Sequence, residues 1–366
     1  MIVRRLALSG FRNYNEQSVE FSPHINVITG ANAQGKTNLL EAVYLLSGAH
    51  SFRTRYDKEL IQFDCSWAKI LADVVSADRE QTIQLLYRHG QNRTVTVNSS
   101  KKKPSELAEL VRVVLFSPED LYLIKEGPAV RRRLMDSAIS QLRPAYGALI
   151  ADYNRLLESK TKILKEWRER PDLLDTLDVY SDRMAKISAR VIRYRESYVR
   201  RLCAAANEIH RDFSGNAESL HLKYQTVSSV EDAAASAEDI YYRICDHQEK
   251  HRAAELDSGL CLTGIHKDDI CIDINRNSAR SYASQGQTRT AALSIKLAER
   301  EIMLEETGEY PILLLDDVLS ELDAKRQSFV LNRIAGGQTL ITCCEDESIT
   351  ERTGGHVITI KNGTIC

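Results

Sequence analysis

The sequence predicts an α/β protein in which one domain of strands and helices is interrupted by a long helical insertion. Short apolar runs separated by turn residues fill the chain up to about residue 120 and return after about residue 262. Between them lies a stretch with many charged residues, few glycines and apolar residues at helical spacing. We therefore expect a split domain comprising residues 1–120 and 260–366, and an inserted helical lobe comprising residues 121–259.

The elements of the split domain follow from these runs and turns. In its first part we expect a helix over 36–47 and strands over 2–8, 25–29, 70–75, 82–87, 94–97 and 111–116. In its second part we expect helices over 287–304 and 323–334, a hairpin turn at 362–363, and strands over 270–274, 312–315 and 339–343. The run 312–315 is apolar on both faces, which is typical of a central strand in a parallel sheet.

The inserted lobe contains one clear helical stripe. Its apolar residues recur at steps of four and three along one face: Tyr180, Met184, Ile187, Val191 and Tyr194. Such a stripe is compatible with a short coiled coil or with a helix packed in a bundle. Because the stripe lasts only a few turns, we favour the bundle.

The composition limits the classes of function. The chain has 366 residues, of which 43% are hydrophobic and 27% charged, as in ordinary globular proteins. No run approaches the ~20 apolar residues of a membrane-spanning helix, and residues 1–8 do not resemble a secretory signal, so we expect a cytoplasmic protein. Because the net charge is only −2, nucleic-acid binding would require a local basic surface. The eight cysteines show no zinc-ligand spacing and are expected to be reduced thiols.

A phosphate-binding loop is the most specific motif. It matches the pattern G-x-x-x-x-G-K-[ST], and its residues, with the one that follows, are Gly30, Ala31, Asn32, Ala33, Gln34, Gly35, Lys36, Thr37 and Asn38. An expected strand precedes the loop and an expected helix follows it, as the motif requires. We expect the loop to bind a nucleotide, with Lys36 on its β and γ phosphates and the Thr37 hydroxyl on Mg²⁺.

Two adjacent acids follow the apolar run 312–315. We expect Asp316 to be the second protein ligand of Mg²⁺, and Asp317 stands where a general base could act on an attacking water. Lys36 and Asp317 are thus the candidate catalytic residues. The two acids could instead belong to a helix cap, since Ser320 and Asp323 are also good capping residues.

A second helix with an N-terminus suited to phosphate begins near residue 284. Its first residues are Ser284, Gln285, Gly286 and Gln287. The order of phosphate loop, helical insertion, this segment, the acid pair and the run 320–323 resembles an ABC-type ATPase head of the SMC group. The resemblance implies that two ATPs are held between two subunits, with Ser284 on the γ phosphate of the opposite subunit. It also implies that Ser320 and Asp323 belong to the D-loop, which couples the two sites.

Within that group, the chain resembles the RecF family over nearly its whole length. The motifs that carry the resemblance are residues 6–14, 51–54, 116–121, 131–133 with Asp136, and 266–269. The resemblance implies an ATP-induced homodimer with weak ATPase activity that binds double-stranded or gapped DNA. It further implies that RecO and RecR are partners and that RecA is loaded on single-stranded DNA, in DNA repair, replication and the SOS response. Arg12 and Asn13 are expected near the nucleotide.

The DNA contacts are the least defined part of this expectation. The candidates are basic runs: Lys101, Lys102, Lys103, Arg131, Arg132 and Arg133, together with a helix that carries Arg190, Arg193, Arg195, Arg200 and Arg201. Charge runs are more often solvated surfaces than binding sites. The lysines adjoin an expected hairpin turn, and residues 131–133 could serve the ATP site or the fold.

Some features depart from the ABC pattern, and other functions compete. The segment before Gly286 reads Ala-Ser-Gln, and Asp317 stands where ABC proteins usually have Glu; both features resemble RecF. Transporter ATPases place a histidine after the strand that ends here at Cys343 and Cys344, so the γ-phosphate sensor is unassigned, as is a Q-loop glutamine. The missing histidine and the large insertion argue against a transporter subunit. The short segment after Asp323 argues against an SMC-like nuclease, and a metabolic kinase ranks last.

Overall fold

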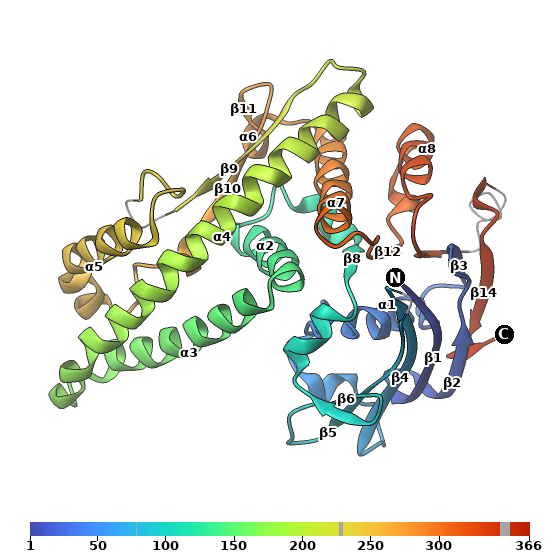
Figure 1. The fold of residues 1–366 in the computed structure, drawn as a ribbon, viewed down its shortest axis with the longest axis horizontal. Helices are drawn as coiled ribbons and strands as arrows, with labels where there is room; N and C mark the ends of the chain where they lie inside the picture. Colours follow the sequence, from blue (N-terminus) through green and yellow to red (C-terminus); the bar gives the residue numbers. More distant parts are fainter. Residues whose placement is uncertain (78, 227–229, 345–351) are drawn as a thin grey trace. The chain divides into compact units, whose positions relative to one another are not determined.

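The computed structural model describes residues 1–77, 79–226, 230–344 and 352–366 (Figure 1). Its contacts divide the chain into two compact units: Met1–Tyr122 with Ala292–Cys366, and Leu123–Ala291. We call them the first and the second unit. Residues 260–291, which we assigned to the split domain, belong by their contacts to the second unit. The assignment of these units as a split ATPase domain and an inserted lobe stays a prediction.

The first unit contains two sheets. One is antiparallel in the order β2-β1-β4-β5-β6-β7, with bounds β1 (Ile2–Phe11), β2 (Tyr14–Glu20), β4 (Trp67–Ser76), β5 (Arg79–Arg88), β6 (Thr94–Val97) and β7 (Ser100–Lys102). The other has the order β15-β14-β3-β13-β12-β8, with bounds β3 (Ile25–Thr29), β8 (Val113–Phe116), β12 (Ile312–Asp316), β13 (Thr339–Cys343), β14 (His356–Lys361) and β15 (Thr364–Ile365). All pairs of the second sheet are parallel except β14 with β15.

Helices complete the first unit. They are α1 (Lys36–Leu45), α8 (Ala324–Arg333) and the part of α7 (Gln285–Thr307) from Ala292 onward. One hydrophobic cluster contains side chains from both sheets and from α1, including Leu39, Leu40 and Val43. Every residue of β12 and β13 is buried, as expected for an apolar strand in the middle of a parallel sheet. The strands and helices predicted for both ends of the chain are confirmed.

The second unit is built mainly of helices. They are α2 (Pro128–Leu142), α3 (Pro144–Glu166), α4 (Leu174–Ser214), α5 (Ala237–Ser258) and the short α6 (Ala279–Tyr282). The 41-residue α4 packs against α3, α5 and β9 (Leu220–Gln225) (Figure 1). Met184 and Val191 of the predicted stripe are buried. The stripe therefore faces other elements of the same unit, as in a bundle.

The inserted helical lobe also contains a strand that the sequence did not predict. Strand β9 pairs with β10 (Asp269–Ile274), which pairs with β11 (Asn277–Ser278) in a three-stranded antiparallel sheet. Leu220, Leu222 and Tyr224 are buried and alternate with exposed residues. This period of two is the signal of a half-buried strand, and it was hidden by the long helical pattern around it.

A buried arginine links the elements of the second unit. Arg195 of α4 is 2% exposed and forms ion pairs with Asp136 at 3.0 Å and with Asp268 at 3.1 Å. It also donates to the Ile265 carbonyl oxygen at 2.8 Å and to the Tyr146 hydroxyl at 3.0 Å. Because a buried charge needs partners for all its donors, Arg195 has a structural role, which removes it from the candidate DNA contacts.

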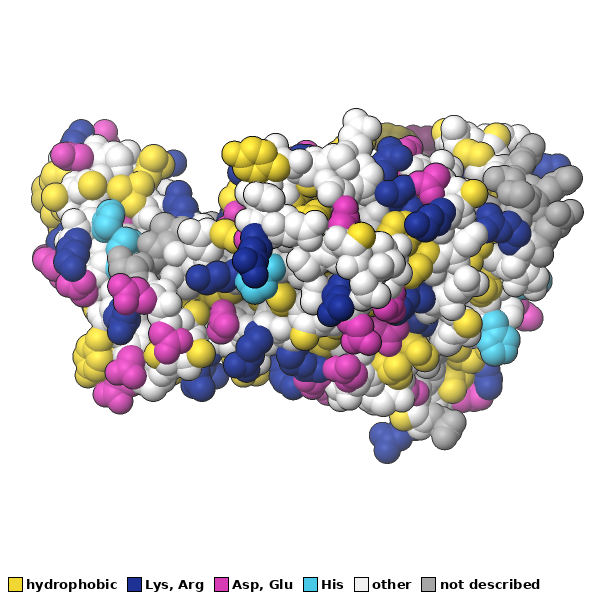
Figure 2. All heavy atoms as spheres, turned by 90° about the horizontal axis from the view of Figure 1, so that it is seen from above, with side chains coloured by type: hydrophobic (Ala, Val, Ile, Leu, Met, Phe, Trp, Pro, Cys, Tyr) yellow, Lys and Arg dark blue, Asp and Glu magenta, His cyan; other side chains and the backbone are white. Residues whose placement is uncertain are grey.

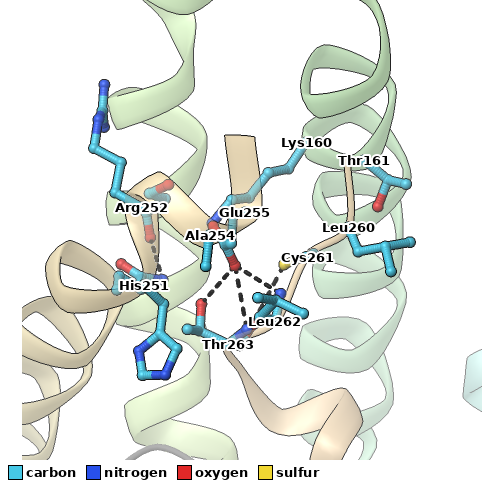
Figure 3. A network of polar contacts seen from close by, with 12 residues as sticks. Lys160, Thr161, His251, Arg252, Ala254, Glu255, Leu260, Cys261, Leu262 and Thr263 are labelled. Carbon is cyan, nitrogen blue, oxygen red and sulfur yellow. Dashed lines mark hydrogen bonds and ion pairs between the residues drawn. The ribbon is translucent and has the colours of Figure 1, made fainter. Parts of the chain in front are cut away.

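A second buried pair fixes the end of α5 (Figure 3). The ammonium of Lys160 lies 2.7 Å from a carboxylate oxygen of Glu255, and both side chains are at most 4% exposed. Glu255 also accepts hydrogen bonds from the backbone N–H groups of Leu262 and Thr263 and from the Thr263 hydroxyl. Burial acts to raise the pKa of Glu255, but Lys160 and these donors outweigh it and hold that pKa below its ordinary value. The chain after α5 is thereby tied to α3.

The neutral His266 predicts a pH dependence of stability. Burial lowers its pKa to about 4 from the ordinary 6.5, and its ring accepts from the Tyr153 hydroxyl and donates to the Cys261 carbonyl oxygen. Because the unfolded chain binds the proton more tightly, stability is fully present above pH 6.5 and is lost as the pH falls toward 4. We expect a loss of about 1 to 3 kcal/mol in the free energy of unfolding. Urea titrations across this range should show a smaller loss for His266→Gln; an equal loss would contradict the assignment, and the exposed His24→Gln is the control.

Candidate nucleotide-binding site

The phosphate loop connects the end of β3 to the start of α1. Its first glycine, Gly30, has φ +147°, and a Cβ there would lie 2.4 Å from the Ile360 carbonyl oxygen. Gly35 has φ +117°, and a Cβ there would lie 2.7 Å from the Asn13 amide nitrogen. Both positions therefore require glycine, because of the backbone conformation and because of the close neighbours.

Lys36 is held across the loop. Its ammonium donates to the carbonyl oxygens of Gly30 at 2.6 Å and Ala31 at 3.1 Å, and it lies 3.8 Å from the sulfur of Cys344. The Cys344 thiol in turn donates to the Asn32 side chain at 2.9 Å. The charge of Lys36 thus lies inside the ring of loop residues in which we expect phosphate.

The proposed metal ligands are in contact. The Thr37 hydroxyl donates to a carboxylate oxygen of Asp316 at 2.9 Å, and Thr342 of β13 donates to the same oxygen at 2.9 Å. A hydroxyl beside a carboxylate is the oxygen donor set that Mg²⁺ prefers. Thr37 and Asp316 are 279 positions apart in the sequence, and they meet because β3, β13 and β12 are neighbours in one sheet.

Asp317 has the surroundings of an activated carboxylate. Its φ is +51°, a conformation that is uncommon for residues other than glycine, and its backbone N–H donates to the Thr342 hydroxyl at 2.8 Å. One carboxylate oxygen is buried and has no hydrogen-bond partner among the described residues. Burial raises the pKa of Asp317 above its ordinary value, Asp316 and Glu321 raise it further, and Lys36 opposes them. The side chain is therefore poised to accept a proton.

Arg12 and Asn13 form the turn between β1 and β2, next to the loop. The Asn13 amide donates to the Gln34 carbonyl oxygen at 2.9 Å and accepts from Asn38 at 2.8 Å. Arg12 makes two hydrogen bonds of 2.8 Å to the fully buried Glu41 of α1. Asn13 thus contacts the loop directly, whereas the guanidinium of Arg12 is paired with the carboxylate of Glu41.

Ser284 begins α7 in the second unit. Its hydroxyl accepts from the Gln287 backbone N–H at 3.2 Å, and the Gln287 side chain accepts from the Ser284 N–H at 2.9 Å. This reciprocal pair is a capping box. Gln287 also donates to Glu218 at 2.8 Å. Ser284 and Gln285 are exposed and Gly286 is half-buried, so the helix start presents its hydroxyl to the surface.

The run 320–323 contains a helix cap, and its role as a D-loop stays a prediction. The Ser320 hydroxyl donates to the Asp317 carbonyl oxygen at 2.6 Å. Asp323 caps α8 and accepts from the Arg326 N–H at 3.0 Å, a bond that holds the pKa of Asp323 below its ordinary value. Asp316, by contrast, faces Thr37, so it does not cap this helix.

The candidate DNA contacts differ in exposure. Lys101, Lys102 and Lys103 are exposed, and Lys102 pairs with Glu106 at 3.0 Å. Arg133 is exposed, and Arg132 is half-buried and donates to the Asp268 carbonyl oxygen at 2.7 Å. Figure 2 shows Lys and Arg side chains interspersed with Asp and Glu side chains on the face that it draws. No single charge sign dominates that face.

Arg131 has to be withdrawn from these candidates. It is 3% exposed and forms an ion pair with Asp269 at 2.6 Å. It also donates to the carbonyl oxygens of Leu123 and Glu126 at 3.0 and 2.9 Å. A side chain with this burial and these partners holds the fold together and does not reach a phosphate on the surface.

Several residues of the site were not predicted. Thr342 and Cys344 lie at the end of β13, and the turn at Asn362 and Gly363 lies against Gln34. A hydroxyl or thiol at the end of a parallel strand beside the loop's own strand was a weak signal in the sequence. No pattern in the sequence indicated that this turn contacts Gln34, because the contact depends on the pairing of β14 with β3.

Comparison with known proteins agrees with this geometry. Residues 2–364 match the family model described as RecF/RecN/SMC N terminal domain. The DNA replication and repair protein RecF of Acetivibrio thermocellus is 38% identical over 362 residues, which cover 99% of this chain and 98% of that protein. The RecF of Bacillus subtilis (strain 168) is 38% identical over 371 residues, which cover 100% of both chains. The chain belongs to the RecF family of SMC/ABC-type ATPases.

Solved structures support the same assignment. A RecF structure described as the recombination mediator protein RecF-ATPrS in the RecFOR pathway superposes with a TM-score of 0.93 at 34% identity, covering 100% of this chain and 97% of that chain. The Smc head domain of Pyrococcus furiosus superposes with a TM-score of 0.55 at 15% identity, over 99% of this chain and 94% of that chain, a likeness of fold alone. The predicted RecF-type ATPase head fold is thus confirmed. In the residues described, none of the helices combines the length and apolar character needed to cross a bilayer.

Proposed function

We propose that this RecF-family chain is an ATP-switched DNA-binding protein of recombinational repair. The observation that carries the proposal is the contact between Thr37 and Asp316, because it joins the phosphate loop and the acid pair into one nucleotide site. The RecF relatives whose structures are described as RecF-ATPrS and RecF-ATP support ATP as the nucleotide. Thr37 and Asp316 would hold the Mg²⁺ ion, which neutralises phosphate charge when bound.

The chemistry that these residues support is slow hydrolysis of ATP. The loop N–H groups and Lys36 orient the phosphates, as in other phosphate loops. Asp317 accepts a proton from the water that attacks the γ phosphorus, and ADP leaves with the bridging oxygen. Two copies assemble on two ATPs, with Ser284 of each copy donating to the γ phosphate bound by the other. Ser320 links this interface to Asp317 through the bond to its carbonyl oxygen.

The output of the switch is DNA binding by the dimer. The exposed candidates for phosphate contacts are Lys101, Lys102, Lys103 and Arg133, with Arg132 beside them. Such contacts follow the DNA backbone and do not read sequence, so double-stranded DNA or a gap junction is the expected ligand. RecO and RecR act with the dimer to load RecA on single-stranded DNA, in the cytoplasm and as a part of the SOS response. The solved RecF relatives are recombination mediators of the RecFOR pathway, which supports these partners.

Nucleotide-dependent DNA binding tests the proposal. Fluorescence anisotropy of a labelled duplex with a gap should show tight binding with Mg²⁺ and ATPγS and weak binding without nucleotide. If six or more phosphates are neutralised, affinity should fall by about 10³-fold or more between 50 and 200 mM salt. Lys36→Met should remove the increase in DNA affinity that the nucleotide causes. A DNA affinity that depends on neither the nucleotide nor the salt concentration would overturn the proposal.

A further inference from the structure

The turn between β14 and β15 touches the phosphate loop. The backbone N–H of Asn362 donates to the side-chain oxygen of Gln34, and the N–H of Gly363 donates to the Gln34 carbonyl oxygen at 3.2 Å. That carbonyl oxygen also accepts from the Asn13 amide at 2.9 Å. The peptide carbonyl of Gln34 is therefore held by two donors and its side chain by a third, and all three lie more than 20 residues away in the sequence.

This turn is itself anchored on two sides. Strand β14 runs parallel to β3, the strand that leads into the loop, and the hydroxyls of Thr29 and Thr359 lie 3.3 Å apart. On the other side, the Ile365 N–H donates to the Gln17 side chain of β2 at 3.0 Å. The turn therefore has a fixed position in the first unit, and it can hold the loop in place.

The contact leaves no room for a side chain at Gly363. Gly363 has φ +70°, and a Cβ there would lie 2.7 Å from the Asn13 carbonyl oxygen. Likewise, a Cβ on Gly30, the loop's first glycine, would lie 2.4 Å from the carbonyl oxygen of Ile360 near the end of β14. The β14–β15 hairpin thus contacts the loop near both ends, at Gly30 and at Gln34.

We propose that the Asn362–Gly363 turn is a positioning clamp for the phosphate loop. By fixing the Gln34 peptide it sets the direction of the N–H groups that follow at Gly35 and Lys36, which must converge on phosphate. Both turn residues donate to Gln34 and would act on the nucleotide through the loop, so we assign them as positioning residues. The inference rests on the proposed nucleotide function of the loop. It adds that a hairpin about 330 residues away in the sequence sets the affinity of the loop for the nucleotide.

A matched pair of glycine variants tests the clamp. Gly363→Ala and Gly90→Ala place the same side chain at the same φ of +70°, but no neighbouring atom of the described residues lies within 4 Å of a Cβ at Gly90. We expect Gly363→Ala to raise the Kd for mant-ATP with Mg²⁺ about tenfold or more, and Gly90→Ala to leave it unchanged. Hydrogen exchange of peptides covering 30–38 should quicken only in Gly363→Ala.

The outcomes separate the clamp from the nucleotide site itself. If the wild type does not bind mant-ATP, the proposed function fails. If the wild type binds and both glycine variants bind equally well, only the clamp is overturned. Should Gly363→Ala not fold, Gln34→Met is the second variant, because it removes the acceptor of the Asn362 N–H while keeping the length of the side chain. A wild-type Kd and wild-type exchange in that variant would also overturn the clamp.

Discussion

Asp317→Asn should retain ATP binding and lose ATP turnover by a factor of about 10² to 10⁴, the usual contribution of a general base. The amide keeps the size of the carboxylate, but it cannot accept the proton of the attacking water. Because hydrolysis would normally end the ATP-bound state, the variant should accumulate the ATP-bound dimer. In the wild type, turnover should rise with pH through the raised pKa of Asp317, since only the ionised form acts as a base.

Measurement of phosphate release and of mass by light scattering checks this expectation. The control is Asp246→Asn, the same substitution at an exposed position of α5 whose carboxylate forms an ion pair with Lys250 of the same helix. The melting temperature of Asp317→Asn should be no lower than that of the wild type. The variant loses a carboxylate with a buried oxygen that has no hydrogen-bond partner in the described part of the chain. Wild-type turnover in Asp317→Asn would remove this residue from the mechanism.

Ser284→Arg should abolish the ATP-dependent dimer. A long cationic side chain at the start of α7 fills the position that we assign to the γ phosphate of the other subunit, and it opposes the positive end of the helix dipole. The phosphate loop belongs to the first unit and is unaltered, so each monomer should still bind ATP. With Mg²⁺ and ATP, light scattering should give twice the monomer mass of 41.4 kDa for the wild type and the monomer mass for the variant.

The substitution also removes a helix cap, which on its own costs about 1 kcal/mol of stability. Ser236→Arg isolates that effect, because Ser236 caps α5 in the same way and accepts from the Asp239 N–H at 3.0 Å. We expect both variants to melt slightly earlier than the wild type and only Ser284→Arg to remain monomeric. An ATP-dependent dimer of Ser284→Arg would contradict the sandwiched arrangement and favour a self-contained phosphate-loop enzyme.

Local patterns in the sequence were enough for the elements that depend on nearby residues. The phosphate loop follows from its spacing of glycines, Lys36 and Thr37, because one strand, one turn and one helix create the anion site by themselves. The burial of β12 follows from a run that is apolar on both faces. The capping role of Asp323 was also readable, since a cap needs only the three residues that follow it.

Tertiary structure decided which of the distant groups meet. In the sequence, nothing in the basic run 131–133 indicated that Arg131 would be buried against Asp269, 138 residues away. The segment 220–224 shows only a short alternation of apolar and polar residues, and its pairing with β10 makes it a strand. The turn at Asn362 and Gly363 was readable as a hairpin, but its contact with Gln34 was not. Turn type depends on local backbone angles, whereas that contact depends on β14 lying beside β3. The sequence by itself thus determined the parts of the nucleotide site, and the parallel sheet decided what surrounds them, because sheet pairing joins segments without regard to their distance along the chain.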